Sequence, residues 1–136
     1  MNAPQKPLPQ ATPETEEYWA GLQRGELRIQ RCRACNRHYF YPRPFCPHVG
    51  CHSRDVEWTT VSGKGKLHSY VIAHRAHPAF ASPYVIAVVT LDEGPKMMTN
   101  ILIDNPTPET LPADAPVQIV YETVNEKVTL PKFRLV

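Results

Sequence analysis

In the second half of the chain, short apolar and alternating segments predict a series of β-strands. The strands expected from this pattern cover residues 64–74, 84–91, 96–103, 117–123 and 128–133. The segment 84–91 is almost continuously apolar, which is typical of a strand buried on both faces or in a barrel. Turns such as Ser62-Gly63-Lys64-Gly65 separate these segments. Five short strands with no helix between them predict a small closed barrel of the oligonucleotide/oligosaccharide-binding (OB) type.

The first quarter of the chain predicts one helix. Its apolar stripe, at helical spacing, consists of Tyr18, Trp19 and Leu22. Thr12 or Thr15 would cap its start, acidic residues follow in the first turn, and Gly25 suits an end near Arg24. Residues 1–12 contain several prolines and no periodic pattern, so we expect a tail there that is either flexible or draped over the protein. Residues 27–32 alternate and predict a short strand.

The four cysteines are the strongest chemical signal. They form two close pairs within 20 residues, Cys32-x2-Cys35 and Cys46-x4-Cys51. Two such pairs on facing turns supply the tetrahedral thiolate set that Zn²⁺ prefers. A four-thiolate site leaves no open coordination position, so we expect a structural metal and no metal catalysis.

Several alternatives remain open for this loop-rich segment. A disulfide framework is disfavoured because no export signal is visible, and a redox Cys-x-x-Cys would not need the second pair. A rubredoxin-like iron site would use the same ligands. The wider second gap contains His48, and His52 follows Cys51, so either imidazole could replace a thiolate. The simpler interpretation is that both histidines are surface residues of a loop.

Charge is unevenly distributed, although the formal net charge is only +2. Residues 24–54 contain seven arginines and one glutamate, which gives a local charge of +6. Residues 76–136 contain four positive and seven negative side chains, which gives −3. One interpretation is that the arginines solvate a small module and balance its thiolates. The other is a site for phosphates, because a guanidinium donates paired hydrogen bonds to phosphate oxygens.

No catalytic constellation is evident. The sequence has no Gly-rich phosphate loop and no Gly-x-Ser-x-Gly elbow. His68 and His74 share strand parity and could face one side of the barrel, but solvent-facing histidines are commoner. Six aromatic residues could stack on bases or on an acyl chain, or could instead fill the core and the contact between modules. They are Phe40, Tyr41, Phe45, Tyr70, Phe80 and Tyr84.

Length and composition limit the class of protein. A chain of 136 residues that is 42% hydrophobic and 21% charged is one domain, or one domain with a small module, and is not wholly disordered. No segment approaches the ~18 apolar residues of a membrane span, and no secretory signal is visible, so we expect a cytoplasmic protein. A pI of about 8.4 is too mild to indicate a nucleic-acid binder.

The order of motifs along residues 13–135 resembles the DUF35 family of small zinc-ribbon and OB-fold proteins. The matching motifs are the Tyr-Trp helix, the first cysteine pair, Tyr-Pro-Arg-Pro at 41–44, Ser-Gly-Lys-Gly at 62–65 and Leu-Asp-Glu-Gly at 91–94. The gap between Cys46 and Cys51 is longer than the family pattern, and residues 111–116 lack the glycine often found before the fourth barrel strand.

The resemblance implies a mainly β protein in three parts. These are an N-terminal tail and helix (1–26), a rubredoxin-like zinc ribbon (27–58) and a five-stranded OB-fold barrel (59–136). It also implies a non-catalytic accessory subunit in a hetero-oligomer with a thiolase-like, aldolase or hydratase subunit that acts on acyl-CoA. The catalytic nucleophile would then belong to the partner.

The candidate residues follow from these two lines of reasoning. Structural Zn²⁺ would be held by Cys32, Cys35, Cys46 and Cys51. Contact with CoA or with the partner would be made by Arg33, Arg37, Tyr41, Arg43, Phe45 and Lys64. Two other functions remain open: a single-stranded nucleic-acid module, for which arginine with aromatic residues is suitable chemistry, and a rubredoxin-like electron carrier.

Overall fold

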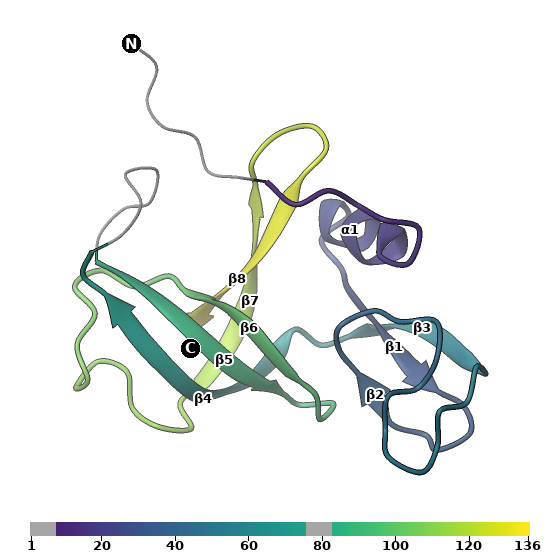
Figure 1. Ribbon diagram of the computed structural model, residues 1–136. Helices are drawn as coiled ribbons and strands as arrows, with labels where there is room; N and C mark the ends of the chain where they lie inside the picture. Colours follow the sequence, from purple (N-terminus) through teal and green to yellow (C-terminus); the bar gives the residue numbers. More distant parts are fainter. Residues whose placement is uncertain (1–7, 76–82) are drawn as a thin grey trace.

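The computed structural model describes residues 8–75 and 83–136, and there it contains one helix and eight strands (Figure 1). Phe80 and the first seven residues of the predicted tail lie outside the described residues. The elements are α1 (Glu16–Gln23), β1 (Leu27–Cys32), β2 (His38–Tyr39), β3 (Val56–Val61), β4 (Lys64–Ala73), β5 (Tyr84–Leu91), β6 (Lys96–Ile101), β7 (Pro116–Thr123) and β8 (Thr129–Leu135). The mainly β architecture is confirmed.

The five strands from β4 to β8 form a closed barrel in the order β4-β5-β6-β8-β7. β4 closes the barrel by pairing antiparallel with β7, and β6 and β8 form the one parallel pair among the described strands. Counted from the first barrel strand, this order is 1-2-3-5-4 with closure onto strand 1, which is the OB topology. The predicted OB-type barrel is therefore confirmed.

Two glycines at the start of β4 are required by close packing, Gly63 directly before the strand and Gly65 within it. Gly63 has a φ of +75°, and a Cβ there would strike the side chain of Ile119. At Gly65, a Cβ would meet the carbonyl oxygen of Thr90 on the neighbouring strand β5. The Gly-x-Gly spacing of this motif thus has a steric cause in the closure of the barrel.

The helix joins the two sheets. It ends in a Schellman motif, in which Gly25 has a φ of +76° and the N–H groups of Gly25 and Glu26 donate to the carbonyls of Leu22 and Gly21. The side chains of Tyr18 and Leu22 are buried, and the helix contacts β1 on one side and β7 and β8 on the other. As a result, the helix, the three-stranded sheet and the barrel share one apolar core.

β1 pairs with β2 and β3 to form the antiparallel sheet β2-β1-β3. β3 extends through Val61, which is farther along the chain than the predicted boundary between ribbon and barrel. Neither β2 nor β3 is expected from the sequence pattern. β2 has only two residues. β3 alternates over Val56-Glu57-Trp58-Thr59 only, and most of its residues are half-buried rather than alternately buried and exposed.

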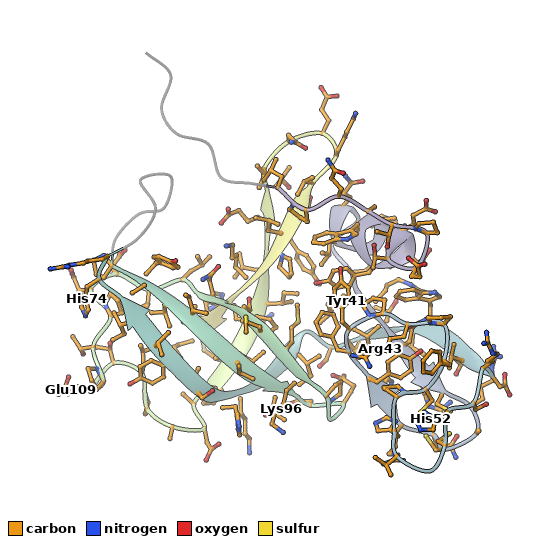
Figure 2. All side chains as sticks on the ribbon, in the orientation of Figure 1. Tyr41, Arg43, His52, His74, Lys96 and Glu109 are labelled. Carbon is orange, nitrogen blue, oxygen red and sulfur yellow. The ribbon has the colours of Figure 1, made fainter. Side chains whose placement is uncertain are left out.

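His68 and His74, which could face one side of the barrel by strand parity, do not keep that parity in the structure. A β-bulge between Leu67 and Ser69 shifts the register at His68, so the strand parity is broken there. His74 follows β4 at the end of the barrel that is remote from the ribbon (Figure 2). Both histidines are exposed, which fits the solvent-facing interpretation.

Candidate metal centre and ribbon surface

The first cysteine pair lies on a tight turn at the end of β1. Cys32 is the last residue of the strand, and its N–H donates to the carbonyl of Arg37 at 2.9 Å. Its own carbonyl accepts from the N–H of Asn36 at 2.8 Å, and Asn36 has a φ of +59°. This turn directs Cys32 and Cys35 to the same side.

The second pair lies on a loop that faces this turn. The N–H of Cys46 donates to the carbonyl of Ser53 at 2.8 Å, and the N–H of Cys51 donates to the carbonyl of His48 at 3.1 Å. Gly50, at the third position of this four-residue turn, has a φ of +84°. The longer gap between Cys46 and Cys51 is thus taken up by one additional turn.

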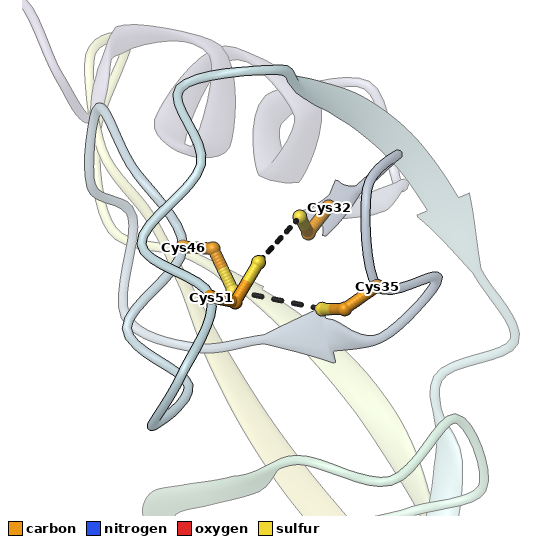
Figure 3. Close-up of side chains that lie close together, drawn as sticks. All are labelled: Cys32, Cys35, Cys46 and Cys51. Atoms are coloured by element: carbon orange, nitrogen blue, oxygen red, sulfur yellow. Dashed lines mark hydrogen bonds between the residues drawn. The ribbon is translucent and has the colours of Figure 1, made fainter.

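The four sulfur atoms converge on one point (Figure 3). Cys32 Sγ lies 3.6 Å from Cys51 Sγ, Cys35 Sγ lies 3.7 Å from Cys46 Sγ, and all four sulfurs lie within 4.8 Å of one another. With Zn–S bonds of about 2.3 Å, the sulfurs of a tetrahedral site would be about 3.8 Å apart. The donor set and its spacing therefore fit a structural Zn²⁺ held by four thiolates.

The surroundings of the thiols differ from one cysteine to the next. Burial raises the pKa of Cys46 to about 12. Burial would also raise the pKa of Cys35, but the guanidinium and backbone of Arg37 beside it lower that pKa to about 6. A divalent cation favours the thiolate form at every position, because a coordinated thiol is deprotonated. A bound metal is thus the natural counter-charge for this cluster.

His48 lies against the centre but outside the set of four sulfurs. Its Nδ1 is 3.1 Å from Cys46 Sγ and 3.9 Å from Cys35 Sγ. The imidazole is therefore placed to hydrogen-bond a thiolate. His52 is exposed and its ring lies 6.4 Å from that of Phe45.

Most of the ribbon's arginines are neutralised within the chain. Arg33 contacts Asp55 at 2.8 Å and Glu57 at 3.1 Å, and Arg31 contacts Glu57 at 3.1 Å. Arg24 and Arg28 are likewise paired with carboxylates. Arg37 lies beside the thiol of Cys35, and the attraction raises its pKa. The local excess of positive charge read from the sequence is thus largely offset by carboxylates and thiols.

Three ribbon arginines have no ion pair to a carboxylate among the described residues: Arg37, which lies beside the Cys35 thiol, and Arg43 and Arg54. The backbone position of Arg43 sets it apart. Its backbone is held firmly, because its N–H donates to Gln30 Oε1 at 2.6 Å and its carbonyl accepts from the hydroxyl of Tyr39 at 2.9 Å. The guanidinium itself is exposed. Neither Gln30 nor Tyr39 is a candidate in the sequence analysis, since no motif signals this role.

Two aromatic candidates flank Arg43. Tyr41 is 42% exposed and Phe45 is 38% exposed, although both are large apolar groups. Tyr41 is anchored at one edge, because its ring packs against those of Phe40 and Tyr18 at centroid distances of 5.2 and 5.9 Å. We call the exposed residues Tyr41, Arg43 and Phe45 the ribbon surface, of which Tyr41 and Arg43 are labelled in Figure 2.

Lys64 belongs to a different part of the molecule. It is the first residue of β4 and lines a shallow groove of the barrel together with Lys66, Gln118 and Val136. No described residue of the ribbon lines that groove. The structure therefore brings Tyr41, Arg43 and Phe45 together and places Lys64 elsewhere.

The described residues include no helix that is long and apolar enough to span a lipid bilayer.

Family models cover most of the chain. The model of the rubredoxin-like zinc ribbon domain of ChsH2 matches residues 19–57, and that of the C-terminal OB-fold domain of ChsH2 matches residues 58–122. These two descriptions agree with the sheet-and-cysteine module and with the barrel described above.

Similar proteins include an enzyme subunit and a scaffold protein. A probable enoyl-CoA hydratase alpha subunit of Thermomonospora curvata is 35% identical over 132 residues, which cover 95% of this chain and 40% of the hydratase subunit. The chain thus spans about two fifths of the length of that relative. A DUF35 domain-containing scaffold protein of Methanothermobacter thermautotrophicus is 30% identical over 84% of this chain and 86% of the scaffold protein.

A similar fold is present in a solved structure. A chain of the Ltp2-ChsH2(DUF35) aldolase is 34% identical and superimposes with a TM-score of 0.80, over 93% of this chain and 98% of that chain. Together with the cysteine geometry and the barrel topology, these similarities show that the chain belongs to the DUF35 family, with the ChsH2 arrangement of a zinc ribbon followed by an OB-fold domain.

Proposed function

We propose that this chain is a non-catalytic accessory subunit of an enzyme complex that acts on an acyl-CoA thioester. The complex would form or cleave a carbon–carbon bond of the thioester, or add water to it. The observation that carries the proposal is the similarity over nearly the full length of both chains to a component of the Ltp2-ChsH2(DUF35) aldolase. The similarity to an enoyl-CoA hydratase alpha subunit supports the same class of complex.

The chemistry of the described residues supports a role without catalysis. All four cysteines are drawn into one cluster, so none remains as a nucleophile elsewhere. A site filled by four thiolates has no position for a substrate or a reactive water. His68 and His74 are exposed, and the β-bulge at His68 breaks the strand parity between them. The nucleophile and the base would then be supplied by the partner subunit.

The ribbon surface is the part of the chain that we assign to acyl-CoA or to the edge of the partner's CoA site. Arg43 offers an exposed guanidinium that no carboxylate of the described chain neutralises, beside two half-exposed aromatic rings. A guanidinium binds phosphate oxygens, and aromatic rings pack on the adenine or the pantetheine arm. Arg33 and Arg37 contribute by holding the ribbon in shape.

Purification of the tagged chain from its native cells tests the subunit assignment. We expect a thiolase-like, aldolase or hydratase subunit to co-purify in a fixed ratio, to be identified by mass spectrometry, and to depend on the chain for its yield or activity. Recovery of single-stranded nucleic acid without an enzyme subunit would contradict the proposal and favour a nucleic-acid module.

The ribbon surface is tested on the purified complex with CoA. Arg43→Ala should weaken CoA binding or subunit assembly about tenfold, which is the scale of one charge-assisted hydrogen bond. Arg54→Ala is the matched control, because Arg54 is also an exposed and unpaired arginine of the ribbon. Wild-type affinity and wild-type assembly for Arg43→Ala would rule out this assignment and leave the subunit proposal intact.

A further inference from the structure

The outer face of strands β4, β5 and β6 is apolar where a barrel normally meets water. The alternation of β5 sends Val85, Ala87 and Val89 inward, so Ile86 and Val88 point outward. They are half-buried but are not part of the core cluster. We call the outward residues Val71, Ile86, Val88 and Met98 the apolar barrel face.

The strand register makes this face continuous. Val71 pairs with Ile86, and Val88 pairs with Met98, so the four side chains occupy two adjacent rows across three strands. Val71 is 60% exposed and Met98 is 71% exposed. Aliphatic side chains this exposed, and grouped rather than scattered, mark a surface that meets another molecule.

A row of lysines borders one end of the apolar barrel face. Thr90 on β5 pairs with Lys66 on one side and with Lys96 on the other, which places both lysines on the outer face. Strands β4, β5 and β6 contain no Asp or Glu at all. The face therefore carries positive charge with no carboxylate on its own strands to neutralise it.

We propose that the apolar barrel face is the docking surface for the enzyme subunit of the complex, through a hydrophobic patch bordered by carboxylates that pair with Lys66 and Lys96. This inference rests on the proposed function and names a surface for it. β5 and β6 are the second and third strands of the barrel, and OB folds commonly bind oligonucleotides and oligosaccharides on the face of this pair, so the fold uses this surface for binding.

The chemistry of the face selects a protein over the other candidate occupants. Single-stranded nucleic acid binds such a barrel by stacking its bases on aromatic rings. The two rows of the apolar barrel face, which also include Ser69 and Asn100, contain no aromatic side chain. A second copy of the chain would bring the same pair of lysines against this face, and its nearest carboxylates, Asp92 and Glu93, lie in the hairpin beyond the strands. A different protein with an apolar patch bordered by carboxylates would complement both the aliphatic side chains and the lysines.

The face continues toward the ribbon. The hairpin between β5 and β6 and residue Lys96 line a cleft of about 490 Å³ together with His38 and Phe40 of the ribbon. Phe40 packs against Tyr41, at a centroid distance of 5.2 Å. An enzyme subunit bound to the apolar barrel face would therefore reach the ribbon surface that we assign to CoA. The surface that binds the subunit and the surface that binds CoA would then be adjacent.

Charge introduced into the apolar barrel face tests the inference. Val71→Glu and Met98→Glu should each reduce binding of the enzyme subunit that co-purifies with the wild-type chain by at least tenfold, measured with both purified proteins by calorimetry. Val124→Glu is the matched control, because Val124 is also exposed, at 42%, but follows β7 outside the face. Melting curves and zinc content should match those of the wild type, which shows that the variants are folded.

Hydrogen exchange on the wild-type complex provides a test without substitutions. We expect slower exchange in β4, β5 and β6 when the enzyme subunit is bound. Full binding by Met98→Glu together with unchanged exchange in these strands would overturn the docking surface, while the subunit proposal would stand. Absence of any co-purifying enzyme subunit would overturn both. Two other results would assign the face to a different occupant and would also overturn the inference. One is self-association of the chain that Met98→Glu abolishes, and the other is tight binding of a labelled single-stranded 12-mer that the same substitution abolishes.

Discussion

At the scale of single residues, two side chains below the ribbon surface hold its backbone in place through hydrogen bonds to Arg43. Gln30 is buried on β1, and its amide oxygen accepts the N–H of Arg43 at 2.6 Å. Tyr39 donates from its hydroxyl to the carbonyl of the same residue at 2.9 Å. Two inward side chains thus fix one segment on the outside and keep the guanidinium free to bind.

Replacement of Tyr39 by Phe should show this support directly. The variant keeps the ring but loses the hydroxyl donor, and one such hydrogen bond contributes about 0.5–1.5 kcal/mol to the free energy of unfolding. We expect a loss of stability in that range by urea titration and faster hydrogen exchange around Arg43, with unchanged zinc content. Unchanged exchange at this segment would show that the hydroxyl does not hold it.

A second residue-scale prediction concerns alkaline pH. Burial raises the pKa of Tyr18, and then the neighbouring Tyr41 raises it further, while burial raises the pKa of Tyr39 to about 12. The folded chain therefore binds these phenolic protons more tightly than the unfolded chain does. The corresponding stability is complete below about pH 10 and is lost as the pH rises through the folded pKa values.

Denaturant titrations between pH 8 and pH 11.5 measure this loss. The free energy of unfolding should fall with pH above about 10, and Tyr18→Phe should make the fall less steep. A profile that is equally steep in the variant would show that Tyr18 does not contribute. Comparison at pH 8, where both phenols are neutral, separates this effect from any change in packing.

At the scale of elements, the metal takes the place of a hydrophobic core in the ribbon. The turn at Cys32 and Cys35 and the loop at Cys46 and Cys51 contribute mainly sulfur to the space between them. Without a metal ion, the guanidinium of Arg37 is the counter-charge described beside four thiols that lie within 4.8 Å of one another, and it is too little for four thiolates. The geometry of both loops therefore depends on the ion.

Removal of one thiolate should unfold these loops and leave the barrel intact. We expect Cys46→Ser to lose zinc by elemental analysis, with loss of hydrogen-exchange protection around residues 32–56 and retained protection in β5 and β6. His48→Gln is the informative control, because the imidazole lies outside the four sulfurs and zinc should be retained. Zinc loss in the histidine variant and retention in the cysteine variant would mean that His48 is a ligand.

Elements differed in how far the sequence determined them. The barrel strands follow from short apolar or alternating segments, and the predicted number of five strands is correct, because each strand has one face in the core. β3 escapes a sequence analysis, since it is half-buried along most of its length and acquires its pairing only from β1. The metal centre is predictable because ligand spacing is local. The neutralisation of the arginines is not predictable, because their partners Glu17, Asp55 and Glu57 lie outside the positively charged segment 24–54.

At the scale of the whole molecule, one helix couples two modules that differ in what stabilises them. The ribbon relies on its thiol cluster, whereas the barrel relies on an apolar interior around Phe133. Leu22 is almost completely buried on α1, and the helix contacts β1 as well as β7 and β8. Both modules therefore share part of their stability through the same side chain.

Replacement of Leu22 by Ala should weaken both modules together. Removing a buried leucine side chain costs about 2–5 kcal/mol, and the cavity would lie between the ribbon and the barrel rather than in either one. We expect the urea midpoint to shift equally when it is followed by exchange in β1 and by exchange in β8. Val124→Ala, at an exposed position after β7, should leave both unchanged. A shift confined to β1 would show that the helix belongs to the ribbon alone, and that the barrel presents its outer face independently of the metal-binding module.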